Sequence, residues 1–298
     1  MKKRHVMFFM LAFFIIIPLL AACGNDSSEE GLAENGTTEE TETDNNESNS
    51  EEGSDLEGTI TMAGSTSVQP LSEELAAVFM ELHPETRLEV SGGGSGAGVT
   101  AAQESAADFG AVSREIKDEE TGITAEVIAI DGIAIIAHPD NSLTDIALED
   151  VTKIFAGEIT NWSEVGGDDQ DIVVVSREDG SGTRGAFTDI VLGDEELVES
   201  ALIHNSTGGV LEAVANDPNA IGYASTGAVS DSVVALAVDG FEPTLENIQS
   251  GDYAVSRPFN YAMNEDAELS ELAQAFLDFV LSDEGQKVVE ENGFIPVN

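Results

Sequence analysis

The fold is decided by residues 59–67, which read Thr-Ile-Thr-Met-Ala-Gly-Ser-Thr-Ser. Polar and apolar side chains alternate over the first four residues, as they do in a half-buried β-strand. A Gly/Ser/Thr-rich turn follows, and Pro70 then stands where the first turn of a helix tolerates proline. Apolar residues next recur at helical spacing, at Leu71, Leu75, Val78, Phe79 and Leu82. The stretch therefore predicts a strand, a tight turn and a helix in succession.

The same unit recurs twice along the chain. A strand at 87–90 leads into a turn at 91–98, Ser-Gly-Gly-Gly-Ser-Gly-Ala-Gly, and a helix at 99–107. A strand at 172–175 leads into a turn at 176–184, Ser-Arg-Glu-Asp-Gly-Ser-Gly-Thr-Arg, with helical pattern from Gly185 onward. The remaining pattern predicts strands at 108–113, 127–137, 221–224 and 233–238, and helices at 148–155, 269–281 and 284–291. This alternation predicts an α/β fold, with sheets flanked by helices.

The three turns share a chemistry that suits an anion. Glycine lets a backbone approach a ligand closely, and the first N–H groups of a helix lack partners within that helix. The helix N-terminus also carries a partial positive charge. One such turn is more often a plain helix cap than a site. Three in one chain, with Arg177 ahead of the third, predict a convergent site for an oxyanion.

The N-terminus predicts export and anchoring to the outer face of the cell membrane. Lys2, Lys3 and Arg4 precede an apolar stretch at 6–20, which has the length of a signal-peptide core. Residues 20–24, Leu-Ala-Ala-Cys-Gly, resemble a lipobox, so residues 1–23 are interpreted as a lipoprotein signal peptide with Cys23 acylated; the alternative is an ordinary secretion signal. Two acyl chains suffice for stable anchoring. Cys23 is the only cysteine, which excludes disulfides within the chain and cysteine-ligated metals.

Charge sets further bounds. Residues 24–57 hold 13 acidic and no basic residues among polar ones, which predicts a disordered acidic tether; a partner-binding acidic tail is the alternative. Residues 58–298 hold 45 acidic and 8 basic residues, a formal net charge of −37. This balance argues against binding of nucleic acid and against docking on anionic lipid. It also suggests a saline or alkaline external medium, in which salt screens self-repulsion.

The glycine-rich turns are compatible with other functions only weakly. Gly92, Gly94 and Ala97 fit a loose dinucleotide fingerprint, with Asp108 as an acidic residue closer than usual. Val99 stands where a P-loop would have lysine. A secreted phosphatase or esterase could use Ser95 or Ser181 as its nucleophile. Neither serine lies in a Gly-x-Ser-x-Gly elbow, and the sequence pattern indicates no general base for either.

Nor does the sequence predict a cofactor or a metal. His83, His138 and His204 are scattered and lack the spacing of metal ligands. Asp168, Asp169 and Asp171 lack the pattern of a calcium loop, and are interpreted as a solvated acidic turn.

Several longer motifs carry a family resemblance from about Gly58 to the end of the chain. They are residues 63–70, 93–98, 107–111, 154–162 (Ile-Phe-Ala-Gly-Glu-Ile-Thr-Asn-Trp), 176–184, 220–224 and 256–258. With these motifs in this order, the chain resembles the phosphate-binding proteins of bacterial ABC phosphate importers. The resemblance implies a monomeric binding protein, not an enzyme, that delivers inorganic phosphate to membrane permease subunits. It implies a two-lobed clamshell of the type II periplasmic-binding-protein fold with two crossovers, residues 58–132 plus 243–298 forming one lobe and 133–242 the other.

The resemblance also implies the site residues. Thr66, Ser67 and Ser95 would donate from the first two turns, and Arg177, Ser181, Gly182 and Thr183 from the third, while Asp108 matches the family's acidic residue. Ser67 departs from members with a larger side chain there. Ser113 and Arg114 are candidates for the cleft, Arg114 equally for a structural ion pair.

Asp108 is the residue expected to select the ligand. A carboxylate can accept a hydrogen bond from protonated phosphate and repels sulfate, which carries no proton at neutral pH. The alternatives left open are another oxyanion (sulfate, molybdate or tungstate), the secreted phosphatase or esterase, and a purely structural surface protein.

Overall fold

The computed structural model describes residues 56–298. The interpretations of residues 1–23 as a signal peptide with Cys23 acylated, and of 24–55 as most of the tether, lie outside the described residues. None of the helices in residues 56–298 combines the length and apolar character needed to cross a bilayer.

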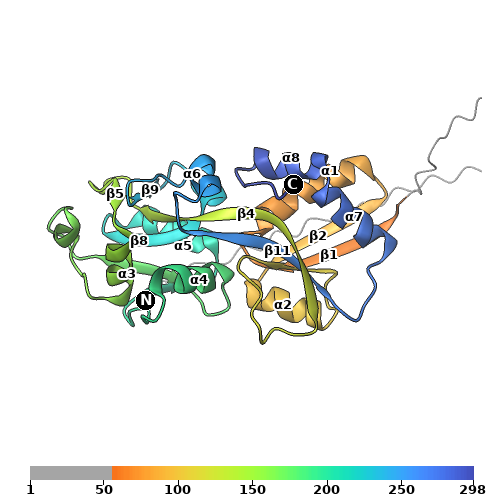
Figure 1. Cartoon of the computed structure of the whole chain (residues 1–298), viewed down its shortest axis with the longest axis horizontal. Helices are drawn as coiled ribbons and strands as arrows, with labels where there is room; N and C mark the ends of the chain where they lie inside the picture. The colour runs from red at the N-terminus through yellow and green to blue at the C-terminus, as the bar shows by residue number, and fades with distance from the viewer. Residues whose placement is uncertain (1–55) are drawn as a thin grey trace, which may run out of the picture. The chain divides into compact units, whose positions relative to one another are not determined.

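Strands and helices alternate along the chain (Figure 1). The strands are β1 (Gly58–Gly64), β2 (Thr86–Gly92), β3 (Phe109–Val112), β4 (Ile123–Ala137), β5 (Asp145–Ile146), β6 (Val173–Arg177), β7 (Leu202–His204), β8 (Ala220–Ser225), β9 (Val234–Ala235), β10 (Ala237–Val238) and β11 (Ser256–Asn264). The α-helices are α1 (Gln69–Leu82), α2 (Ser95–Gln103), α3 (Leu148–Ala156), α4 (Gly182–Phe187), α5 (Thr207–Asn216), α6 (Leu245–Ser250), α7 (Glu271–Leu281) and α8 (Asp283–Glu291). Short helices η1 (Trp162–Val165), η2 (Thr188–Leu192) and η3 (Thr226–Ala228) complete the set.

One sheet runs through both lobes in the order β2-β1-β3-β11-β4-β8-β6-β7, with β9 pairing β4. β1, β2 and β3 are parallel, as are β6, β7 and β8, whereas β4 and β11 run antiparallel to their neighbours. β4 pairs first with β11, up to Gly132, and then with β8 from Ile133. In Figure 1, β4 and β11 are the strands that connect the lobes. The predicted two-lobed α/β fold with two crossovers is confirmed.

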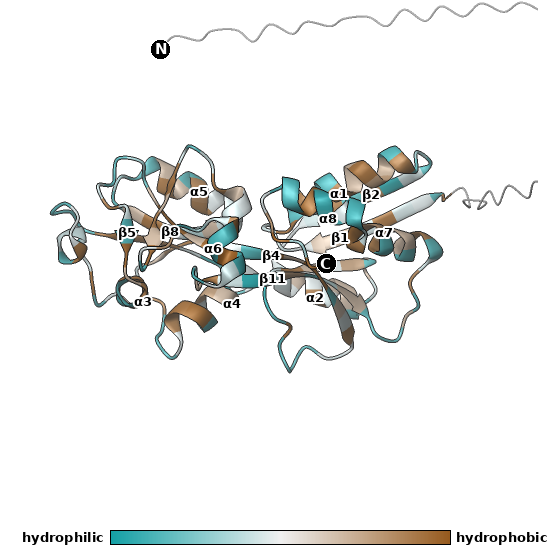
Figure 2. Ribbon diagram, turned by 45° about the horizontal axis from the view of Figure 1, so that its top comes forward, coloured by the Kyte–Doolittle hydropathy of each residue, from teal (hydrophilic) through white to brown (hydrophobic). Residues whose placement is uncertain are grey.

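Each lobe has helices on both faces of its strands. In the first lobe, Ile60 and Met62 face a core with Phe79 of α1 and Phe276 of α7, whose rings meet edge-on at 5.3 Å. Its other face packs against α2 through Val99. In the second lobe the side chains of β4 alternate between two cores. Ile133, Ile135 and Ala137 pack toward α3 and α4, whereas Ala134 and Ile136 pack toward α5. In Figure 2 the helices of both lobes, among them α1 and α5, carry both apolar and polar residues.

The second core also includes Ile248 of α6, Tyr253 and Val255. Because these residues precede β11 and pack in the second lobe, the chain returns to the first lobe along β11. The lobe limits at 132/133 and 242/243 remain predictions.

The structure differs from the expected elements in a few places. α2 and α4 begin at Ser95 and Gly182, within their glycine-rich turns, rather than at 99 and 185. The expected strand at 233–238 is divided into β9 and β10. The sequence pattern does not predict β5, β7, β11, α5 or α6. Pro258 argues against a strand interior, but it pairs with Ile130, whose N–H and C=O both bond to Ile295, so no N–H of residue 258 is needed on that side.

Candidate functional site

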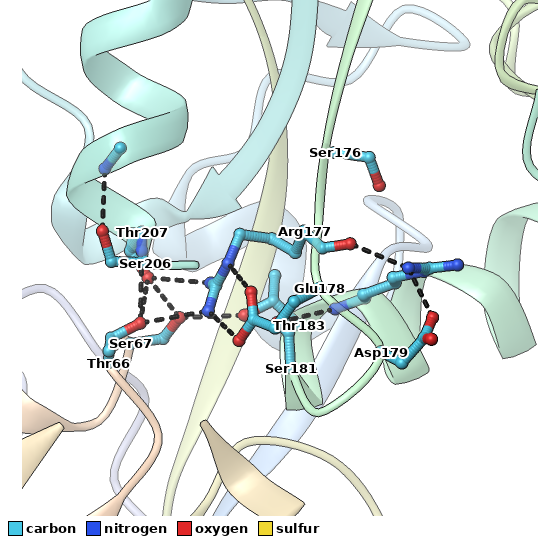
Figure 3. A network of polar contacts seen from close by, with 12 residues as sticks. Thr66, Ser67, Ser176, Arg177, Glu178, Asp179, Ser181, Thr183, Ser206 and Thr207 are labelled. Carbon is cyan, nitrogen blue, oxygen red and sulfur yellow. Dashed lines mark hydrogen bonds and ion pairs between the residues drawn. The ribbon is translucent and has the colours of Figure 1, made fainter. Parts of the chain in front are cut away.

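Four turn–helix junctions meet between the lobes. The turns after β1 and β2 begin α1 and α2 in the first lobe, and those after β6 and β7 begin α4 and α5 in the second. Ser67 Oγ lies 2.9 Å from Thr183 Oγ1 and 2.9 Å from Thr207 Oγ1, and Thr66 Oγ1 lies 3.2 Å from Thr207 Oγ1. We call these four residues, drawn in Figure 3, the hydroxyl cluster. Each is a side chain that can both donate and accept hydrogen bonds.

Arg177 supplies the positive charge beside the hydroxyl cluster (Figure 3). It is the last residue of β6 and is 2% exposed. Its Nη2 donates to Thr66 Oγ1 and its Nη1 to Thr207 Oγ1, each at 3.3 Å. Its Nε and Nη2 also donate to the two carboxylate oxygens of Glu178, at 3.0 and 3.1 Å. This fork of bonds fixes the plane of the guanidinium, with one edge on the carboxylate and the other on the hydroxyl cluster.

A second group of hydroxyls lies at the start of α2. Ser65 Oγ donates to Ser113 Oγ at 2.8 Å, Ser95 Oγ is 3.3 Å from Ser113 Oγ, and Ser113 N donates to Ser95 Oγ at 3.0 Å. We call these three residues the serine cluster; all are buried. Gly182 of α4 packs directly on them, because a Cβ at this position would stand 2.1 Å from Ser95 Oγ. The serine cluster of the first lobe therefore meets the N-terminus of α4 from the second.

The turn before α4 is stabilised by a capping serine within it and by an aromatic pair packed beside it. Ser181 Oγ caps the helix by accepting from Arg184 N at 3.2 Å, which leaves its own O–H free to donate. Tyr223 stacks on Phe187 at 4.1 Å and bonds to Ser176 Oγ at 2.7 Å. Burial raises the pKa of Tyr223, so its phenol stays neutral beneath Arg177. The Ser181 cap and the stacked rings of Tyr223 and Phe187 thus support the turn from which α4 begins.

The prediction that Asp108 lies with the other site residues is wrong. Its Oδ2 accepts from Thr61 N at 2.8 Å and from Thr61 Oγ1 at 2.9 Å, before β3 begins. Ser113 follows the opposite end of β3, and five extended residues span about 16 Å. Asp108 lines a separate cavity of about 180 Å³ with Ser105, Asn264 and other residues. The hydroxyl groups gather at the carboxyl ends of the parallel strands, where α/β proteins bind ligands, and Asp108 is at the amino end.

Arg114 takes a structural role, and Ser95 and Ser181 lack the partners of catalytic serines. Arg114 forms a two-pronged ion pair with Glu120, at 2.7 and 2.6 Å. Ser95 and Ser181, in the part of the chain that the structure describes, have hydroxyl or backbone partners rather than a general base. Within residues 56–298 no group of three or more metal-ligating side chains forms a site.

Two residues of the site were missed by sequence reasoning. Thr207 lies in the turn His204-Asn205-Ser206-Thr207-Gly208, where Ser206 caps α5 by accepting from Gly209 N. This is a fourth Gly/Ser/Thr-rich turn, followed by apolar Val210 and Val214 at helical spacing, so the pattern used for the other three would have found it. Glu178 stands within the motif at 176–184, and its pairing with Arg177 has no separate signal in the sequence.

The chain is similar to proteins of known family. Residues 37–284 match the family model described as a PBP superfamily domain. The phosphate-binding protein PstS of Bacillus subtilis is 34% identical over 99% of this chain and 95% of its own length. A crystal structure of a putative phosphate ABC transporter substrate-binding protein from Clostridium perfringens, with bound phosphate, superposes with a TM-score of 0.79 at 43% identity, over 81% of this chain and all of that one. An ABC-type phosphate transport receptor from Vibrio cholerae gives 0.66 at 35% identity, over 79% and 99% of the two chains.

Proposed function

Because the chain belongs to the PBP superfamily and, within it, to the family of the phosphate-binding proteins PstS, we propose that it captures inorganic phosphate between its lobes and delivers it to an ABC importer. One observation carries the proposal to specific residues. The hydroxyl cluster draws Thr66 and Ser67 from the first lobe and Thr183 and Thr207 from the second, and one member from each lobe, Thr66 and Thr207, accepts a hydrogen bond from the buried guanidinium of Arg177. Donors from both lobes on a small anion would link the lobes through the ligand.

The proposed ligand-binding residues are Thr66, Ser67, Ser95, Arg177, Ser181, Gly182, Thr183 and Thr207. Hydroxyls and first-turn N–H groups of the helices would donate to the oxygens of the anion, and Arg177 would add a charge-assisted bond. The net charge of the molecule does not oppose this, since solvent screens its distant carboxylates while the local donors act at contact.

Without Asp108, selectivity for phosphate is proposed to come from the hydroxyls. A protonated phosphate can donate a hydrogen bond to a hydroxyl oxygen, whereas sulfate can only accept one. A hydroxyl of the site can therefore either donate to phosphate or accept from it, but it can only donate to sulfate. The discrimination is then smaller than a buried carboxylate would give. Another oxyanion such as sulfate, molybdate or tungstate therefore stays the second candidate ligand.

The proposal extends to how the protein is placed and used. A lipid anchor on Cys23 would hold it at the outer face of the cell membrane, the acidic tether would separate it from the bilayer, and a monomer would present its closed lobes to the permease. It is proposed to act without catalysis, because neither Ser95 nor Ser181 bonds to a base in the described residues.

Titration of the protein, stripped of bound anion, with phosphate, sulfate and molybdate tests the proposal. We expect binding of one phosphate per chain, with sulfate weaker. A preference for molybdate or sulfate would replace the ligand, and the absence of any heat or thermal shift with all three would reject the function. Release of the chromophore from a chromogenic phosphate ester would instead indicate an enzyme.

A further inference from the structure

A buried ion pair lies where the chain crosses between the lobes. Asp131 on β4 and Arg257 on β11 are direct cross-strand partners. Arg257 Nη2 and Nε donate to Asp131 Oδ2 at 2.9 and 3.2 Å, and both side chains are at most 1% exposed. Such pairs are weak evidence for stability, because apolar residues of similar volume often serve a core equally well. Its presence therefore does not by itself indicate a stabilising role.

The pair has a partner in each lobe. Asp131 Oδ1 accepts from Ser225 Oγ at 2.9 Å and from the N and Oγ1 of Thr226 at 3.2 and 3.0 Å, at the end of β8 in the second lobe. Arg257 Nη1 donates to Ser113 O at 3.0 Å, just beyond β3 in the first lobe. The two bonded side chains thus form one continuous polar link across the crossover strands.

The link ends at the proposed phosphate site. Ser113 is the central member of the serine cluster, bonded to both Ser65 and Ser95, and Gly182 of the second lobe packs on that cluster. The ring of Phe259, 5.3 Å from Arg257 Cζ, holds the guanidinium from the side. A shift of Arg257 would therefore move the carbonyl of Ser113 and, with it, the hydroxyls that face α4.

We propose that Asp131 and Arg257 are positioning residues for phosphate binding: they set the serine cluster and tie it to the second lobe without touching the ligand. The inference rests on the proposed function. It distinguishes this ion pair from that of Arg114 and Glu120, whose carboxylate bonds stay within residues 114–120.

The first test is Arg257→Lys. A lysine keeps the charge beside Asp131, but its single ammonium lacks the fork that reaches both Asp131 and Ser113. We expect phosphate affinity to fall at least tenfold in a protein that remains folded by circular dichroism. Asp131→Asn should act in the same direction. Ser225→Ala, which removes one tie to β8 and no charge, should weaken binding about threefold and decides the matter if Asp131→Asn fails to fold.

Tyr253→Phe is the matched control. It removes the buried hydrogen bond that Tyr253 Oη donates at 2.8 Å to the carbonyl of Ile133, which lies on β4 like Asp131, and Tyr253 makes no hydrogen bond to the serine cluster among the described contacts. It should lower the urea midpoint and leave phosphate affinity unchanged. Equal loss of affinity in Tyr253→Phe would mean that any destabilisation of the crossover weakens binding, and would overturn the proposal.

A double-mutant cycle separates positioning from general destabilisation. If Arg257 acts through Ser113, the tenfold effect of Arg257→Lys should shrink to below threefold in a Ser113→Ala background, since the hydroxyl being positioned is gone. Independent effects that multiply would reject the link. A wild-type protein that ignores phosphate would instead reject the proposed function, whereas a wild type that binds and an Arg257→Lys variant that binds equally would reject only the positioning role.

Discussion

Ser67 Oγ and Thr183 Oγ1 lie 2.9 Å apart although they are 116 positions apart in the chain; Ser67 precedes α1 of the first lobe and Thr183 lies in the first turn of α4 of the second. This contact, together with those of Arg177 and Thr207, joins the two lobes at the candidate site. Substitutions that act on this junction should therefore change ligand affinity more than stability.

Arg177→Ala should weaken phosphate binding about 10- to 150-fold. The substitution removes a charge-assisted donor, a loss of about 1.5–3 kcal/mol. Titration calorimetry on protein stripped of anion measures it, with Arg87→Ala, whose side chain is 73% exposed, as the control. Normal binding by the Arg177→Ala protein would place the anion elsewhere.

Gly182→Ala should reduce phosphate affinity at least tenfold. The new Cβ would stand 2.1 Å from Ser95 Oγ and 2.6 Å from Ser113 Oγ, so the serine cluster and α4 must separate. Overpacking of this kind costs about 1–3 kcal/mol. Gly180→Ala, where nothing lies within 4 Å of the new methyl, should bind as the wild type does. Similar affinities in the two variants would contradict the close approach of the lobes.

Thr207→Val should weaken binding about 2- to 10-fold, because a neutral hydrogen bond contributes about 0.5–1.5 kcal/mol and valine keeps the shape. The comparison is Thr100→Val, on α2, whose hydroxyl bonds only to Gly96 O among the described contacts. A Thr207→Val protein with unaltered affinity would remove α5 from the site.

Asp108→Asn should leave phosphate affinity and the preference over sulfate within twofold of the wild type. Its carboxylate accepts hydrogen bonds from Thr61 of β1, beside the amino end of β3 and away from the candidate site. The substitution should therefore cost about 1 kcal/mol of unfolding free energy. Parallel titrations with the two anions and a urea melt measure both quantities. A marked loss of discrimination would return Asp108 to the site.

Glu120→Gln should destabilise the protein in a pH-dependent manner. Burial opposes ionisation, but the hydrogen bonds and charge of Arg114 outweigh it and hold the pKa of Glu120 below 4.5. A lowered pKa in the folded state gives stability that is present above the ordinary value and lost as pH falls through the folded value. The variant should lose about 1.5–3 kcal/mol of unfolding free energy at pH 7, and the difference should narrow below pH 4.5. A gap that stays constant down to acid pH would contradict the ion pair.

The strand–turn–helix units could be predicted because each is local. The alternation at 59–62 and the helical spacing after Pro70 depend only on neighbouring residues, and the structure has β1 and α1 there. β11 could not be predicted in the same way. Pro258 is unfavourable inside a strand, and only the bonds of Ile130 to Ile295 make the position acceptable.

The candidate site was predicted in part for a related reason. Ser67, Ser95, Arg177 and Thr183 lie at or just after the carboxyl ends of strands, and parallel strands bring such ends together whatever their order in the sheet. Asp108 stands next to the same strands, but which end of β3 it occupies depends on where that strand begins. Strand limits are set by pairing, here of Met62 with Phe109, and not by the residues of one strand alone.

The position of β11 between β3 and β4 has a consequence for how the molecule matures. The sheet of the first lobe cannot close until residues 256–264 have been synthesised, although β1 to β3 end at residue 112. A nascent chain that leaves the ribosome from its N-terminus therefore carries an incomplete first lobe until β11 has been made. The sheet of the first lobe is thus completed only by the last strand, which enters between β3 and β4.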